Sequence, residues 1–155
     1  MTEHPGTLPR VRRTCTTLAD GRELIYFDDS EPDRSGAKLR DVADERALGV
    51  RTASGTMRLD ALTGDWVSIA GHRQNRTFLP PADECPLCPT GRGTVPSEIP
   101  ADDYDVVVFE NRFPAFGAES TAPGSSVNPL LAQASATGRC EVVCFTGDHD
   151  AASRP

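Results

Sequence analysis

Two thiols at a Cys-x-x-Cys spacing, Cys85 and Cys88, have the clearest capacity for chemistry in this chain. Such a turn directs both thiolates toward one point, where zinc binds them together with further thiolate or imidazole ligands. His149 follows an apolar run that is typical of a strand, and the end of a strand presents a side chain in a fixed direction. The three residues therefore predict a zinc site with three protein ligands and one position left over.

Other interpretations of these residues stay open at this point. The thiols of Cys85 and Cys88 would equally suit a reduced pair in a proline-stiffened turn. A thioredoxin-type redox pair is disfavoured, because that motif opens a helix and here Pro89 and Gly91 follow. A lone histidine such as His149 is most often a surface or capping residue.

Polar residues elsewhere have weaker signals. Arg73 and Arg76 stand three residues apart and suit a clamp on phosphate oxygens, or else a solvated basic loop. Asn111 follows an apolar strand, where its amide would contact a ligand or cap the strand. Cys140 and Cys144 share one face of a predicted strand, so we interpret them as packed, inert thiols.

Composition narrows the function classes. The chain has 155 residues, 37% of them hydrophobic, and a formal net charge of −7. This balance argues against nucleic acid or an anionic membrane as a partner, since both require clustered Lys and Arg. The five cysteines and the absence of a secretory or membrane-spanning segment at the start favour reduced thiols and a cytoplasmic protein.

The elements expected around these residues are strands joined by loops, an order that predicts an antiparallel sheet. Residues 1–13 are expected to be a flexible tail and 115–138 a flexible insertion, and 42–49 could form a turn or two of helix. Loops are expected at 28–40 and 80–100. Strands are expected at 24–27, 104–109 and 139–145, with a hairpin at 58–70 that turns at 63–65.

Several motifs in a fixed order resemble the N-terminal portion of the galactose-1-phosphate uridylyltransferase family, in the histidine-triad superfamily. The resemblance covers residues 14–150, so we expect 14–155 to be the N-terminal part of a uridylyltransferase domain. The residues that carry it are Leu62 to Val67, Gly71 to Arg76, Glu84 to Pro89, Tyr104 to Pro114, Cys140 to Thr146 and Asp148-His149.

The resemblance implies an α+β fold, an antiparallel half-barrel sheet of the histidine-triad type, here truncated before its helices and catalytic segment. It also implies UMP transfer from UDP-glucose to galactose 1-phosphate through a uridylyl-histidine, in a homodimer. Position by position, Cys85, Cys88 and His149 match zinc ligands. The positions that match substrate-binding residues are Arg73, Arg76, Asn111 and Arg112, the last often Asp in relatives.

One departure from the family pattern is severe. The family's His-Pro-His-Gly-Gln motif is absent from the 155 residues, whose histidines are His4, His72 and His149. We therefore expect the nucleophile to lie beyond Pro155 rather than at His72, the alternative within this sequence. Two other hypotheses stay open. The first is a non-catalytic zinc- and nucleotide-binding module or one subunit of a split enzyme. The second is a different histidine-triad nucleotide enzyme.

Overall fold

The computed structural model describes residues 11–49, 55–74, 80–91, 95–118 and 128–151. The chain divides into two compact units. Unit 1 comprises Met1–Leu48, Pro80–Phe109 and Val143–Pro155, and unit 2 comprises Gly49–Leu79 and Glu110–Val142. No helix in the described ranges is long and apolar enough to cross a membrane.

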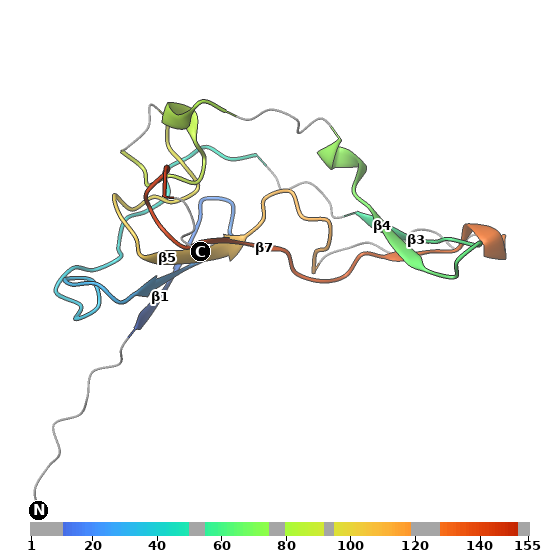
Figure 1. Ribbon diagram of the computed structural model, residues 1–155, viewed down its shortest axis with the longest axis horizontal. Coiled ribbons are helices and arrows are strands. Elements are labelled where there is room, and N and C mark those ends of the chain that lie inside the picture. The colour runs from blue at the N-terminus through green and yellow to red at the C-terminus, as the bar shows by residue number, and fades with distance from the viewer. Residues whose placement is uncertain (1–10, 50–54, 75–79, 92–94, 119–127, 152–155) are drawn as a thin grey trace, which may run out of the picture. The chain divides into compact units, whose positions relative to one another are not determined.

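A four-stranded sheet forms the centre of unit 1. Its order is β1-β2-β5-β7, with β1 antiparallel to β2 and β2 antiparallel to β5 (Figure 1). The strands are β1 (Arg12–Thr17), β2 (Glu23–Asp28), β5 (Val106–Glu110) and β7 (Glu141–Cys144). Leu24, Tyr26, Val107 and Phe109 are buried and supply the apolar core. The β1–β2 turn uses Gly21 at φ 82°, a conformation that favours glycine.

A three-stranded antiparallel sheet in the order β4-β3-β6 forms unit 2. Its strands are β3 (Thr56–Leu59), β4 (Trp66–Ile69) and β6 (Gln133–Ser135), with short 3₁₀ turns η1 (Gly71–Arg73) and η3 (Pro129–Leu131). The hairpin closes through a bond from Asp60 N–H to Asp65 O, 2.8 Å, and Gly64 adopts φ 77°.

Buried ion pairs hold the loops of unit 1 against its sheet. Arg40 is only 5% exposed and lies 2.6 Å from the fully buried carboxylate of Asp28. It also lies 2.8 Å from the half-exposed carboxylate of Asp103. Its guanidinium also stacks 4.8 Å from the ring centre of Tyr26. A second buried cation, Arg22, pairs with Asp20 and Glu98. Charges buried this deeply are retained only when they are paired, so each network fixes the loops that supply it.

The expected strands and the hairpin are confirmed, and their ends shift by a few residues. Loop predictions hold at 29–40 and through the described part of 80–100, apart from the 3₁₀ turn η2 (Ala82–Glu84). Residues 42–49 form no helical turn in the described part.

Two boundary predictions are wrong. The expected tail at 1–13 includes Arg12 and Arg13, which begin β1, because backbone pairing with β2 orders a polar segment that has no apolar signal. Residues 1–10 lie outside the described residues. The insertion expected at 115–138 contains η3 and β6, the latter paired with β3, while 119–127 lie outside the described residues.

The fold class is confirmed only in its coarser form. Antiparallel sheets dominate the described residues, and the helical segments there are 3₁₀ turns of three residues each. The helical component of the α+β class is not seen in this part of the chain. The histidine-triad half-barrel stays a prediction.

Candidate metal centre

The loop that carries the two thiols is built in unit 1 by turns and by backbone bonds to a neighbouring segment. The 3₁₀ turn η2 leads into Cys85. Pro86 O then accepts from Glu98 N–H at 2.8 Å, and Thr90 N–H donates to Ile99 O at 2.9 Å. These two bonds lie on either side of Cys88 and fix both ends of the loop to residues 98–99. The prolines within the loop stiffen it further.

The segment that carries His149 leaves the end of β7. Cys144 is the last residue of that strand, and Thr146 then accepts from Asp148 N–H at 3.1 Å through its hydroxyl oxygen. A local turn of this kind sets the direction of the next side chain. His149 therefore projects from a short, bonded turn directly after a strand.

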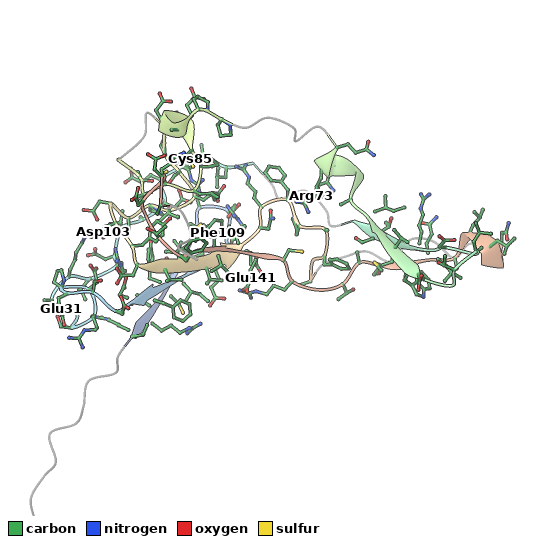
Figure 2. The ribbon with its side chains drawn as sticks, in the orientation of Figure 1. Glu31, Arg73, Cys85, Asp103, Phe109 and Glu141 are labelled. Carbon is green, nitrogen blue, oxygen red and sulfur yellow. The ribbon has the colours of Figure 1, made fainter. Side chains whose placement is uncertain are left out.

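The three predicted ligands come together. One ligand atom from each of Cys85, Cys88 and His149 lies within 4.8 Å of the other two. Cys88 Sγ and His149 Nδ1 are 3.2 Å apart, although 61 residues separate them in sequence. Figure 2 labels Cys85 in the loop near the red C-terminal segment. Ligand atoms around a tetrahedral zinc lie roughly 3.5–3.8 Å apart, so the cluster needs little movement to hold an ion.

Two further side chains lie close to this cluster. Tyr104 Oη donates to Leu87 O at 3.1 Å, inside the Cys-x-x-Cys loop. Burial raises the pKa of Tyr104, and the thiols of Cys144, Cys88 and Cys85 raise it further. Burial also raises the pKa of Cys144, against a hydrogen bond with Tyr104. Both groups therefore stay protonated at neutral pH, so Cys144 is a thiol rather than a ready thiolate ligand.

The other predicted site residues belong to unit 2, and contacts with neighbouring residues are seen for Asn111 and Arg112. Arg73 is exposed at the end of η1 and is labelled in Figure 2. Asn111 accepts from Phe113 N–H through Oδ1 at 2.9 Å, which is the capping geometry weighed above. Arg112 lies 5.7 Å from the ring centre of Phe113. Arg76 lies outside the described residues.

Sequence reasoning missed Tyr104 as a neighbour of the thiols. It placed Tyr104 at the start of a strand over 104–109, whereas the strand begins at Val106 and Tyr104 occupies the loop before it. The position of Cys144 as a packed thiol is as expected, since it is buried at the end of β7. In the sequence, the only indication that Tyr104 and Cys144 lie near the thiols was that each belongs to an apolar run, one before Asn111 and the other before His149.

Comparison with known proteins assigns the family. The sequence model described as "Galactose-1-phosphate uridyl transferase, N-terminal domain" matches residues 43–153, more than half of the chain. The chain belongs to this family. Its match includes all three residues of the candidate metal centre.

Individual members of the galactose-1-phosphate uridyl transferase family are similar over much of the chain. A galactose-1-phosphate uridylyltransferase of Streptomyces lividans is 45% identical over 141 residues, 91% of this chain and 33% of that protein. One of Thermotoga maritima is 33% identical over 96 residues, 62% of this chain and 28% of that protein. The chain thus spans about a third of the length of these relatives. No solved structure matches it.

Proposed function

We propose that this chain is the metal- and nucleotide-binding N-terminal portion of a galactose-1-phosphate uridylyltransferase. The activity is UMP transfer from UDP-glucose to galactose 1-phosphate. The observation that carries the proposal is the 45% identity to the Streptomyces lividans enzyme across 91% of this chain. The uridylyl-accepting histidine is assigned to the two thirds of that enzyme that this chain does not match.

Zinc is the proposed metal. Two thiolates and an imidazole form a borderline-soft donor set that suits zinc better than magnesium or calcium. Cys85 and Cys88 are half-buried and His149 is exposed, so the fourth position faces a side that another ligand can reach. When bound, zinc would tie the 85–88 loop to the segment after β7, and no disulfide does so, since all five cysteines are free.

The proposed substrate-binding residues are Arg73, Arg76, Asn111 and Arg112. Guanidinium groups bind diphosphate oxygens by charge-assisted hydrogen bonds. Arg73 is exposed and available for that role. The Asn111 side chain keeps its amide nitrogen for a nucleotide when Oδ1 accepts from Phe113. We also propose a homodimer and a cytoplasmic location, where five unbridged cysteines persist.

A chimaera tests this function directly. Residues 1–155 would replace the matching third of the Streptomyces lividans enzyme, and UMP transfer between UDP-glucose and galactose 1-phosphate would be assayed. We expect turnover in the chimaera and none from residues 1–155 alone. Covalent transfer needs an imidazole aimed at the α-phosphorus, and no histidine of this chain has a His-x-His context.

The intact Streptomyces enzyme is the positive control, and a chimaera with Cys85→Ser and Cys88→Ser is the matched variant. A folded chimaera without turnover would contradict the proposal and favour a non-catalytic binding module. Turnover by residues 1–155 alone that survives His72→Ala and His149→Ala would show that the assignment of the nucleophile is wrong.

A further inference from the structure

We propose that Tyr104 and Gly147 are positioning residues that arrange Cys85, Cys88 and His149 before any metal binds. The inference rests on the proposed metal centre, but it concerns the metal-free chain. In this proposal Tyr104 contacts both the loop that carries the thiols and the segment that carries the imidazole, and so holds the two together.

The first contact joins Tyr104 to the thiol loop. Its hydroxyl donates to the carbonyl oxygen of Leu87, 3.1 Å away, and Leu87 is the residue between the motif's proline and Cys88. A bond to that carbonyl fixes the peptide plane that leads into Cys88. The Cys88 side chain therefore takes its direction from Tyr104 as well as from the loop's own turns.

The second contact joins Tyr104 to the histidine segment. Gly147 lies two residues before His149 and packs against Pro89 and Tyr104. A methyl group on Gly147 would lie 3.2 Å from Pro89 Cγ, 3.6 Å from Tyr104 O and 3.7 Å from Tyr104 Cε1. The two ligand-bearing segments meet here at close range, and a glycine lets the segment approach.

Tyr104 is itself held firmly. It is 8% exposed and precedes Asp105, whose carboxylate accepts from the backbone N–H groups of Asp29 and Ser30 at 2.9 and 2.8 Å. Val106, the residue after Asp105, begins β5, a strand of the central sheet. A rigid anchor of this kind lowers the entropy that ligands lose when they gather around an ion, and groups that orient ligands typically change metal affinity by about 10- to 100-fold.

Cobalt(II) titration of the 155-residue chain under reducing conditions tests the positioning role, because cobalt bound to thiolates absorbs visible light. We expect Tyr104→Phe, which keeps the ring, to weaken cobalt binding by about three- to tenfold. Gly147→Ala should weaken it as well, and it serves as the second variant should Tyr104→Phe fail to fold. Tyr26→Phe is the matched control, since Tyr26 is a buried tyrosine of strand β2 that contacts Arg40 instead.

A second readout uses no metal. The alkylation rates of Cys85 and Cys88 in metal-free protein, followed by mass spectrometry, should rise in Tyr104→Phe and Gly147→Ala and stay unchanged in Tyr26→Phe. Equal cobalt affinity and equal alkylation rates in all proteins would overturn the positioning role. A wild-type chain that binds no cobalt would contradict the proposed metal centre, and the alkylation rates would then decide the positioning role alone.

Discussion

Among single residues, the approach of His149 to Cys88 is the contact on which the site depends. Sequence reasoning reached it because a Cys-x-x-Cys turn and a histidine after a strand are local patterns, each visible within a few residues. It did not reach Tyr104, since the bond from Tyr104 Oη to Leu87 O spans 17 residues and follows no spacing rule. The clustered thiols and imidazole are thus predictable from the sequence here, whereas the side chains that contact them are set by tertiary packing.

UDP binding tests the proposed substrate residues. We expect the chain to bind UDP weakly, and Arg76→Ala to weaken that binding about tenfold, because a guanidinium contributes paired, charged hydrogen bonds to a diphosphate. Isothermal titration calorimetry measures both affinities. Arg34→Ala is the control, since Arg34 is occupied by Glu31. Identical isotherms for wild type and Arg76→Ala, with clear binding, would place the ligand elsewhere.

Among the elements, the strands that alternate or concentrate apolar residues were predictable, and those with few apolar residues were not. β2 and β5 bury Leu24, Val107 and Phe109, so their sequences carry the signal. β1 is largely polar and β6 is short, and both exist because a neighbouring strand supplies their hydrogen bonds. Likewise, the polar composition of 28–40 predicted a loop but not the buried ion pairs within it.

The ion pair between Asp28 and Arg40 should be essential for unit 1. We expect Asp28→Asn to lower the free energy of unfolding by about 3 kcal/mol, because the buried guanidinium loses its closest counter-charge. Urea denaturation measures the change. Glu31→Gln is the matched control: it removes one partner of the more exposed Arg34 pair and should leave the midpoint unchanged. Equal effects of the two substitutions would contradict the role assigned to Asp28.

The carboxylate of Asp103, a partner of Arg40, should make the free energy of unfolding fall in acid. Burial would raise the pKa of Asp103, but hydrogen bonds from Lys38 and Arg40 outweigh it and hold the pKa below the usual 3.8. The unfolded chain therefore binds this proton at higher pH than the folded chain does. The stabilisation is complete above the unfolded pKa and is lost as the pH falls through the lower, folded pKa.

Asp33 acts in the opposite direction, since burial raises its pKa against the charge of Arg40. Urea midpoints measured from about pH 6 to about pH 3 should fall less steeply for Asp103→Asn than for wild type. Parallel curves for the two proteins would show that Asp103 does not contribute to the acid sensitivity.

At the scale of the whole molecule, the chain is two sheets in two compact units, and it matches about a third of its relatives' length. Unit 2 exposes apolar side chains along the β3–β4 hairpin, with Trp66 47%, Val67 48% and Leu62 97% exposed. Within the described sheet β4 is also an edge strand. Exposed apolar surface beside an open strand edge favours association.

Self-association of residues 1–155 is therefore expected at micromolar concentration. The double substitution Trp66→Thr and Val67→Thr should reduce it, because threonine suits a strand but presents less apolar surface. Sedimentation velocity measures the size distribution. Leu39→Thr, at an exposed leucine of unit 1, is the control and should change little. A monodisperse wild-type monomer would contradict the expectation.

The metal content of the purified chain tests the central claim most directly. Plasma mass spectrometry would be applied to wild type, to Cys85→Ser/Cys88→Ser and to Cys15→Ser/Cys140→Ser, a control that removes two thiols outside the cluster. Because two of the three clustered ligands are lost only in the first variant, we predict about one zinc per chain in wild type and control, and almost none in Cys85→Ser/Cys88→Ser. Equal zinc in all three proteins, or none in wild type, would contradict the metal centre.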